Sequence, residues 1–349
     1  MFQIVEAEFL APDIKRFVIE APWVARKRQA GQFVIVRVHE RGERIPLTLA
    51  DGDPKRGTIT LIVQGIGKTT KLMNMLGPGE ALLDLVGPLG EPSDVKKYGT
   101  VVVIGGGVGA AIAYPTAKAM REAGNHVISI LGGRSKDLVI LEPEIRAISD
   151  EVFISTDDGS YGRKGLVIDP LKDLIAAGRP VDLVLAIGPP RMMQAVAEVT
   201  RPHRIPTIVS LNSLMVDGTG MCGGCRIITT EGAKFACVDG PEFDAHTVDF
   251  NILIQRNRMY GDQEAEALQE FRESPEECLD EARGYCRLEV AHPEVQSSEE
   301  LVSQMYGDQE AEALQEFRES PEECVQEFLE ECRLEAAHPE VQSSEELVS

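Results

Sequence analysis

A chain of 349 residues with 43% hydrophobic and 26% charged side chains has the composition of a globular protein of two or three domains. Its formal net charge is −22 and nothing in the sequence supplies a basic face, which disfavours nucleic acid as a partner. The N-terminus lacks a basic segment followed by an apolar one, and no apolar run is long enough to cross a bilayer. We therefore expect a cytoplasmic protein without a membrane span.

The negative charge is concentrated at the C-terminal end of the chain. Residues 258–349 hold 27 acidic and 6 basic side chains, whereas the other 257 residues hold 30 acidic and 29 basic ones. The seven cysteines divide in the same way, with three close together at Cys222, Cys225 and Cys237 and four in the acidic region. Because thiols stay reduced in the cytoplasm, the group of three favours a metal site over disulfides.

Residues 1–97 are predicted to form a small antiparallel β-barrel. Short β-rich runs such as "GQFVIVRVHE" and "GTITLIVQGIG" are separated by Gly, Pro and Asp, which is typical of strands joined by tight turns. The run "GIGKTT" at 65–70 resembles the end of a phosphate-binding P-loop, but Ile62 stands where that motif needs its first glycine. We interpret it as a turn whose Gly and Thr amides, at a helix start, could still hold a pyrophosphate.

Residues 98–210 are predicted to form a doubly wound parallel sheet, because buried strands, Gly-rich turns and helices alternate along them. Glycines follow three strands, in "GGGVG", "LGGRSKD" and "AIGPP", and a dinucleotide lies at such strand ends in this kind of sheet. We therefore expect nucleotide binding. Arg134 follows the second strand, where an acidic residue would hold the adenosine ribose. That basic turn suits either the 2′-phosphate of NADPH or plain solvation beside Asp137.

Residues 211–257 contain a Gly- and Cys-rich loop and a predicted hairpin, "CRIITTEGAKFACV". Cys222 and Cys225 form a C-x-x-C pair, and Cys237 follows twelve residues later. Structural zinc requires a fourth Cys or His, and His246 lies nine residues beyond Cys237. A redox pair needs no third cysteine, whereas an iron–sulfur site fits a loop rich in glycine amides. Spacing alone favours iron–sulfur and leaves zinc, or no metal, open.

Residues 258–349 are predicted to form an acidic helical tail that contains an internal repeat. The sequence "MYGDQEAEALQEFRESPEEC" begins at Met259 and again at Met305, which gives a period of 46 residues. In each copy "SPEE" predicts a helix start, with Ser as N-cap and Pro at the first helical position. The tail cysteines recur as C-x₇-C, and we interpret them as half-buried helix cysteines rather than metal ligands.

The order of these parts resembles one family. A β-barrel, a nucleotide sheet and a cysteine loop, with the motifs "ERIPLTLAD", "GGGVGAAIAYPTAKAM", "TDDGSYGRKG", "IGPPRMM", "DGTGMCGGC" and "VDGPEFDAHTVDF", are similar to the flavin-containing electron-transfer subunits of the ferredoxin–NADP reductase superfamily. One branch is the electron-transfer subunit of dihydroorotate dehydrogenase. Another is the small subunit of NADH-dependent ferredoxin:NADP oxidoreductase, also described as the beta subunit of sulfide dehydrogenase. The resemblance covers residues 1 to about 257.

The resemblance implies a ferredoxin reductase-like fold with FAD in the barrel. The flavin motif R-P-x-[ST] is matched by Ile45 to Thr48, although the arginine stands one position early. Thr48 would lie against the isoalloxazine, and the helix start at "GIGKTT" would hold the pyrophosphate. The implied flavin residues are Arg44, Ile45, Pro46, Leu47, Thr48, Ile62, Val63, Gln64, Gly67, Thr69 and Thr70.

The resemblance also implies that NAD(H) or NADP(H) docks on the parallel sheet as a diffusible substrate. Asp157 and Asp158 end a central strand near the expected place of the nicotinamide. The implied nucleotide residues are Gly105, Gly107, Gly109, Ala110, Arg134, Asp157, Asp158, Gly188, Pro189, Met192 and Met193. No catalytic acid or base is expected, because the protein only positions the carriers and tunes their potentials.

A 2Fe–2S cluster is the third cofactor that the resemblance implies. In the dihydroorotate subunits four cysteines are spaced five, three, and twelve or more residues apart. Here Asp217, Cys222, Cys225 and Cys237 are spaced five, three and twelve, with an aspartate in the first position. This pattern of one Asp and three Cys resembles the ferredoxin:NADP branch. A carboxylate oxygen in place of a thiolate should alter the potential of the cluster.

The function implied is electron transfer from NAD(P)H through FAD to the 2Fe–2S cluster, or the reverse. The resemblance implies a larger partner subunit with FAD and 4Fe–4S clusters, which would bind ferredoxin and where electron bifurcation would occur. The alternative within enzymes is the electron-transfer subunit of dihydroorotate dehydrogenase. The alternative outside enzymes is a regulatory or scaffolding module that carries cofactors and docks through its acidic tail.

Overall fold

The computed structural model describes residues 1–280, 282 and 283 of the chain. They belong to one compact unit, Met1–Cys286. The second copy of the repeat lies outside the described residues, together with the predicted helix cysteines Cys286, Cys324 and Cys332.

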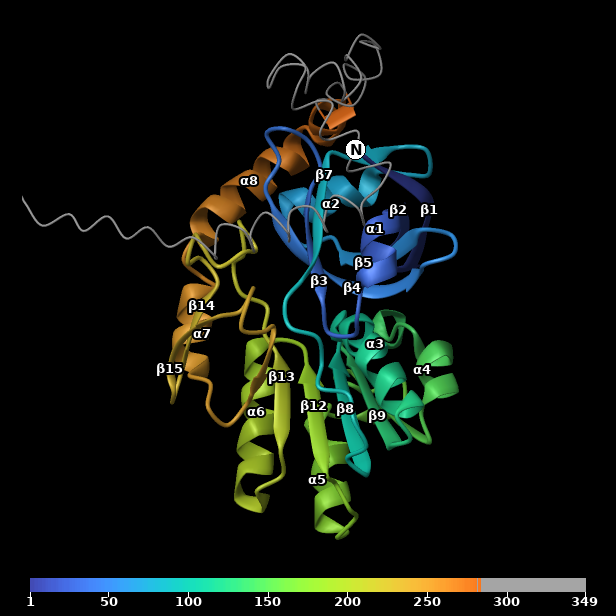
Figure 1. The fold of residues 1–349 in the computed structure, drawn as a ribbon, viewed down its shortest axis with the longest axis vertical. Coiled ribbons are helices and arrows are strands. Elements are labelled where there is room, and N and C mark those ends of the chain that lie inside the picture. The colour runs from blue at the N-terminus through green and yellow to red at the C-terminus, as the bar shows by residue number, and fades with distance from the viewer. Residues whose placement is uncertain (281, 284–349) are drawn as a thin grey trace, which may run out of the picture. The chain divides into compact units, whose positions relative to one another are not determined.

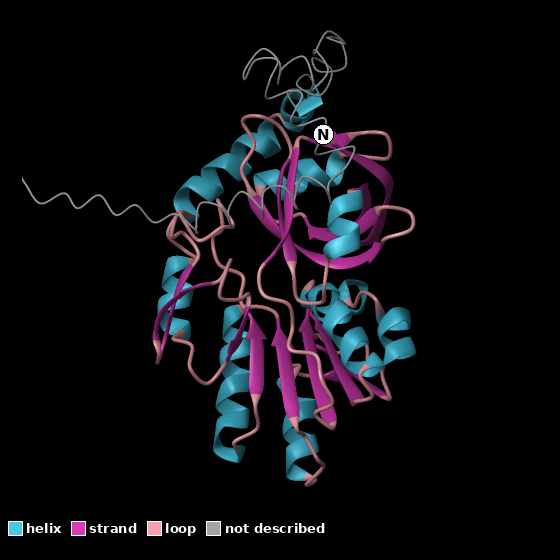
Figure 2. Ribbon diagram, in the orientation of Figure 1, coloured by secondary structure: helices cyan, strands magenta, loops and turns pink. Residues whose placement is uncertain are grey.

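The N-terminal part is a nearly closed antiparallel barrel of seven strands, as predicted (Figure 2). The strand order is β6-β1-β2-β5-β4-β3-β7, so β6 and β7, which follow each other in the chain, stand at opposite ends of the order. The strands are β1 (Phe2–Ala11), β2 (Ile14–Glu20), β3 (Phe33–Arg37), β4 (Ile45–Asp53), β5 (Thr58–Gln64), β6 (Ala81–Leu82) and β7 (Asp84–Leu89).

Alternation of side chains along the strands fills the inside of the barrel. Phe17 and Ile19 of β2 and Leu61 of β5 are fully buried in one apolar cluster. Helix α1 (Pro22–Lys27) and helix α2 (Lys68–Met75) also contribute buried side chains to this cluster. The "GIGKTT" run is therefore the turn from β5 into α2, which begins after Gly67.

The second sheet is doubly wound, as predicted. Its order is β11-β10-β9-β8-β12-β13-β16, and every pair is parallel except β13 with β16. The strands are β8 (Thr100–Gly106), β9 (His126–Gly133), β10 (Glu151–Thr156), β11 (Arg163–Lys164), β12 (Leu183–Ile187), β13 (Thr207–Ser210) and β16 (Glu242–Asp244). The order reverses between β8 and β12, and a ligand binds at such a switch point.

Helices cover both faces of this sheet (Figure 1). Val102 and Ile104 of β8 face a cluster with the helices α5 and α6, while Val101 and Val103 face another with α3. The helices are α3 (Gly109–Glu122), α4 (Glu142–Ile148), α5 (Ile168–Ala176) and α6 (Pro190–Thr200), with 3₁₀ turns η1 (Lys136–Leu138) and η2 (Arg201–His203). No helix among the described residues is long and apolar enough to cross a bilayer.

The predicted hairpin is present as β14 (Arg226–Thr229) and β15 (Gly232–Phe235), and helix α7 (Phe250–Arg256) follows it. Asp249 caps α7, since its carboxylate accepts hydrogen bonds from the amides of Asn251 and Ile252. The cysteine loop thus lies between β13 and the hairpin, and the capped helix α7 comes later in the chain.

The described part of the first copy of the acidic repeat is largely helical, and it packs against the barrel. Helix α8 (Gly261–Glu273) ends at Ser274, and residues 275–280 are helical again, as "SPEE" predicts. Phe271 and Leu279 are buried in the barrel cluster, and the half-buried Cys278 packs against it. The sequence predicts the helices but gives no signal for this packing.

Glu242 joins the barrel, α3 and the last strand of the parallel sheet. Its carboxylate accepts a hydrogen bond from Ser93 Oγ at 2.8 Å, and Ser93 Oγ lies 3.0 Å from Thr116 Oγ1 on α3. A side chain at Gly31 would place its Cβ 2.4 Å from Ser93 Oγ, so the backbone just before β3 lies close to the Ser93 hydroxyl. Burial raises the pKa of the Glu242 carboxyl, and the two hydroxyls oppose that shift.

A raised pKa predicts that Glu242 stabilises the fold only when it is protonated. Its contribution is fully present below the unfolded pKa near 4.5 and is lost as the pH rises through the higher folded value. Glu242→Gln should therefore raise the melting temperature at about pH 8 and have a much smaller effect at about pH 4. The exposed Glu20 provides the control, because Glu20→Gln should change little at either pH. Destabilisation by Glu242→Gln at the higher pH would contradict this assignment.

Candidate functional site

The predicted nucleotide residues lie together at the carboxyl edge of the parallel strands. Gly105 is the second-to-last residue of β8, Arg134 follows β9, Asp157 follows β10 and Gly188 follows β12. These four strands are consecutive in the sheet, in the order β10-β9-β8-β12, and β12 pairs with β8 across the switch point. The structure therefore brings the residues to one edge, and their contact with a nucleotide remains a prediction.

Two glycines at the start of α3 give the turn after β8 its form. Gly107 has a φ of +62°, which favours glycine, and open space lies above its Cα. A Cβ at Gly109 would come within 2.2 Å of the Ile187 carbonyl oxygen, so α3 packs directly on β12. Ala110 is buried in the same region. This close, open turn fits a pyrophosphate on the helix N-terminus.

A methionine covers the glycines on both sides of the switch point. The Met192 sulfur lies 2.6 Å from the position of a Cβ at Gly106 and 2.9 Å from that of one at Gly188. Its side chain thus occupies a cradle that exists only because both residues are glycine. Met193, in contrast, is fully buried in the core beneath α6, so it supports the site rather than lining it.

The turns after β9 and β10 are joined to each other. Asp158 N–H donates to the carbonyl of Arg134 at 3.2 Å, and Lys136 N–H donates to Ser160 Oγ at 2.8 Å. The Asp158 carboxylate accepts from the Ser160 hydroxyl and amide, and these bonds lower its pKa. The basic turn at Arg134 is therefore fixed beside the acidic one.

The predicted flavin residues come together from β4, β5 and the start of α2. Ile45 to Thr48 begin β4, Ile62 to Gln64 end β5, and β4 and β5 are paired. Val63 is buried inside the barrel, so any contact of this residue with a flavin would be made by its backbone. Thr70 Oγ1 accepts from the amides of Ile66 and Gly67 and fixes the turn into the helix.

The N-terminus of α2 is suited to an anion. Its N-cap is Gly67, no side chain caps its first amides and no acidic residue stands in its first turn. Thr69 Oγ1 donates to the Glu43 carboxylate at 2.7 Å, and this carboxylate would have to leave the hydroxyl for a phosphate to bind, because two anions repel each other. The uncapped amides and the hydroxyl otherwise fit the pyrophosphate of FAD. Glu43 was not among the residues that the sequence singled out.

Arg44 connects the flavin segment to the cysteine loop. Its Nε donates to the carbonyl of Val216 at 2.7 Å, although the two residues are 172 positions apart. Val216 directly precedes Asp217, the first of the predicted cluster ligands. Arg44 also lowers the pKa of Asp217 by its charge, after the larger effect of hydrogen bonds from Thr219.

The three cysteines of the loop differ in environment. Cys225 and Cys237 are buried with their sulfurs 3.2 Å apart, while Cys222 is exposed. Burial raises the pKa of Cys237 to about 12, and the neighbouring Cys225 thiol adds to that effect. The amides of Gly224 and Asp217 lower the pKa of Cys222. The loop therefore provides amides that stabilise negative charge on its exposed sulfur.

Asp217 is held in the loop by its own carboxylate. Oδ2 accepts from the amide and the hydroxyl of Thr219, at 2.8 and 2.6 Å, and from the Met221 amide at 3.2 Å. All three of these bonds go to one oxygen. Oδ1 takes none of them, which suits a carboxylate that binds a metal through a single oxygen.

The donor set fits two irons better than one. No three His, Cys, Asp or Glu side chains among the described residues converge closely enough to hold a single metal ion. A binuclear cluster needs only two protein ligands on each iron. Cys225 and Cys237 form one close pair of ligands. Asp217 and Cys222 would form the second pair, because they lie five residues apart in one loop and the Asp217 amide lies beside the Cys222 sulfur. The residues present therefore fit a 2Fe–2S cluster.

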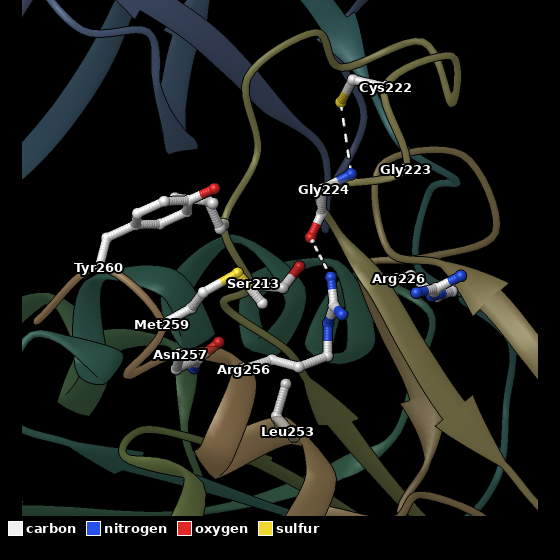
Figure 3. Close-up of a pocket in the computed structure, with 11 residues that line it drawn as sticks. Ser213, Cys222, Gly223, Gly224, Arg226, Leu253, Arg256, Asn257, Met259 and Tyr260 are labelled. Carbon is white, nitrogen blue, oxygen red and sulfur yellow. Dashed lines mark hydrogen bonds between the residues drawn. The ribbon is translucent and has the colours of Figure 1, made fainter.

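A pocket of about 210 Å³ lies beside Cys222 (Figure 3). Gly224 links the two walls, since its amide donates to Cys222 Sγ at 3.5 Å and its carbonyl accepts from Arg256 Nη2 at 3.1 Å. Met259 and Tyr260, the first residues of the tail repeat, line the other side. Arg256 gives no signal in the sequence, because it reaches the loop from a helix 32 residues away.

Comparison with known proteins adds a family to this geometry. A family model described as the iron–sulfur cluster binding domain of dihydroorotate dehydrogenase B matches residues 212–249. A Thermotoga maritima protein, "Dihydroorotate dehydrogenase B (NAD(+)), electron transfer subunit homolog", is 46% identical over 269 residues, which cover 77% of this chain and 95% of that protein. The chain belongs to the family of dihydroorotate dehydrogenase B electron-transfer subunits and their homologues. This confirms the resemblance predicted from the motifs.

Two further relatives distinguish branches of the family. The electron transfer subunit of Geobacillus thermodenitrificans dihydroorotate dehydrogenase B is 35% identical over 254 residues, covering 70% of this chain and 96% of that protein. A chain from a solved structure of NADH-dependent reduced ferredoxin–NADP oxidoreductase is 44% identical, with a TM-score of 0.74 over 78% of this chain and 98% of that chain. The family makes this protein an oxidoreductase subunit.

Substitution of Asp217 tests its predicted place in the cluster. Asp217→Cys should keep the iron and shift the midpoint potential, because a soft thiolate replaces a hard oxygen. Asp217→Ala should lose most of the iron, since one ligand is removed. The measurement is iron content together with redox-titrated EPR of the purified chain. Cys278→Ser, outside the loop, is the control and should keep full iron content. Unchanged iron and an unchanged EPR line shape in Asp217→Ala would show that Asp217 is no ligand.

Proposed function

We propose that this chain passes electrons between NAD(P)H and a larger partner subunit by way of FAD and a 2Fe–2S cluster. The observation that carries the proposal is the 2.7 Å hydrogen bond from Arg44 to Val216, since it joins the flavin segment to the cluster loop. The nucleotide edge of the sheet lies next to the same junction through α3, which contacts β4. All three carriers would therefore be held by one compact unit.

When bound, FAD accepts electron pairs from a nicotinamide and releases them singly to an iron–sulfur cluster, so it must stand between the two. The residues of the chain bind, orient and shield these groups. The first turns of α2 and α3 would hold the two pyrophosphates, and the Gly224 and Asp217 amides would stabilise charge at Cys222. No side chain is required to move a proton.

An exposed apolar surface surrounds the cysteine loop, and we propose that the partner subunit docks there. Met221 is 88% exposed and Met259 is 53% exposed. The other large apolar side chains of this surface are Leu214, Val216, Val238 and Tyr260. Apolar patches of this kind mark interaction sites, and Leu214, Met259 and Tyr260 of this one line the pocket beside the exposed Cys222. The partner that it fits would take electrons from the cluster at this face.

The partner we propose is a larger subunit with FAD and 4Fe–4S clusters, with ferredoxin bound through it, in the reductive environment of the cytoplasm. The support is the 44% identity to a chain of ferredoxin–NADP oxidoreductase, together with Asp217 in place of a first cysteine. The second candidate is a dihydroorotate dehydrogenase partner, which the family match of residues 212–249 favours. The regulatory or scaffolding alternative has no support from these relatives.

Anaerobic titration of the purified chain with NADH and with NADPH tests the proposal. The flavin absorbance should bleach with at least one of the two nucleotides, and the EPR signal of a reduced 2Fe–2S cluster should appear in the same sample. The comparison also reveals which nucleotide is preferred. A protein that binds no flavin, or whose flavin ignores both nucleotides, would refute the proposal.

The identity of the partner is decided by co-purification. A 4Fe–4S subunit recovered with the chain supports the ferredoxin–NADP assignment. An FMN-containing barrel subunit supports the dihydroorotate alternative and overturns the first.

A further inference from the structure

The tail helices are tied to the barrel by a buried aromatic side chain. Phe271, near the end of α8, is only 7% exposed and lies in the barrel cluster with Leu72 and Met73 of α2. Leu279 and Ala282, from the helical residues that follow, are buried in the same cluster. In Figure 1, α8 lies beside the barrel, and its contact with α2 agrees with this burial. Apolar burial, not charge, therefore anchors the tail.

An ion pair ties the same tail segment to the first residue of α2. Glu270, the neighbour of Phe271, lies with Oε2 3.2 Å from Lys68 Nζ. Both side chains are partly exposed, so the pair adds little to stability. Its role is to fix which residues of α8 face the start of α2. Lys68 is followed by Thr69, whose hydroxyl donates to a carboxylate in the site described above.

A second set of contacts ties the tail to the segment after α2. Arg283 Nε lies 2.7 Å from Glu80 Oε1, and the other oxygen of Glu80 accepts from the Gly77 amide at 2.6 Å. The buried Lys15 donates to the carbonyls of Asn74 and Leu76 at the C-terminal end of α2, where it also interacts with the charge of Glu80. Both ends of α2 are thus connected to the first repeat copy.

We propose that the described part of the first repeat copy, residues 259–280, 282 and 283, is a clamp that positions α2 for the pyrophosphate of FAD. Phe271 is the main positioning residue, and Glu270 and Arg283 fix the register at the two ends. The inference rests on the proposed function, because it takes the start of α2 as the flavin site. A helix start holds an anion only while its amides point together at one place, so loosening α2 weakens the site.

The second copy of the repeat provides a matched control within the chain. Residues 305–324 are identical in sequence to residues 259–278, so Phe317 corresponds to Phe271. Beyond the identical stretch, Leu329 stands at the position of Arg283 and Phe328 at that of Ala282. A leucine offers no charge to Glu80, and a phenylalanine exceeds the space of a buried alanine. The first copy is therefore the one suited to the barrel.

The experiment compares Phe271→Ala, Phe317→Ala and the double variant in the full-length chain. Flavin is removed, and FAD affinity, iron content and amide hydrogen exchange of residues 66–76 are measured. Phe271→Ala should raise the dissociation constant for FAD about tenfold or more and speed exchange in α2, because the competent form of the site becomes less populated. Iron content should stay unchanged in every variant. Phe317→Ala should behave like the wild type, and Phe271→Leu should restore most of the affinity.

Each other outcome has a definite meaning. Unchanged FAD affinity in both Phe271→Ala and the double variant overturns the clamp. An equal effect of Phe317→Ala, or a loss confined to the double variant, overturns the assignment to the first copy. Loss of iron along with FAD indicates general unfolding, and Arg283→Gln is then the deciding variant. The clamp predicts that Arg283→Gln binds FAD more weakly and keeps its full iron content. Unchanged FAD affinity in Arg283→Gln would overturn the proposal. If the wild type binds no FAD, the proposed function fails, and hydrogen exchange of α2 still tests the clamp itself.

Discussion

One hydrogen bond, from Arg44 Nε to the Val216 carbonyl, joins the segment that leads into β4 to the cysteine loop, and the electron transfer proposed for the chain depends on that junction. Close packing supports it. Gly218, with a φ of +86°, would place a Cβ 2.8 Å from Leu89 and 3.0 Å from Ile35, so only a glycine lets the loop lie against β3 and β7. The part of the loop that holds Asp217, the first predicted cluster ligand, is thereby packed on the barrel.

Local patterns in the sequence predict most of the fold. Alternation in "GTITLIVQ" and the glycines after "VVVI" depend on neighbours only a few residues away, and these gave the barrel and the doubly wound sheet. Contacts between distant residues gave no such signal. Glu43 at the start of α2, Arg256 at Gly224 and Met192 across two glycines each meet their partners through the tertiary fold. The motifs of the candidate site could therefore be predicted from the sequence, but the contacts between them could not.

The acidic tail is a second case in which the sequence does not predict a contact between distant residues. Its composition is strongly acidic, so the sequence predicts acidic helices, and a single phenylalanine per copy gives no signal of where they pack. The structure buries Phe271 and pairs Glu270 and Arg283 with α2 and Glu80, which makes the described part of the first copy a part of the barrel unit. An acidic helix can thus be a structural element when a few of its side chains have specific partners.

The most direct test of the account is rapid mixing of Arg44→Ala with reduced nucleotide, with flavin absorbance and cluster EPR followed in parallel. The account predicts that, in the molecules that retain FAD, cluster reduction slows far more than flavin reduction, because the loop is no longer held against the flavin segment. Arg56→Ala, which removes an exposed pair with Glu6, should leave both rates unchanged. Cluster reduction at the wild-type rate in Arg44→Ala would contradict the account.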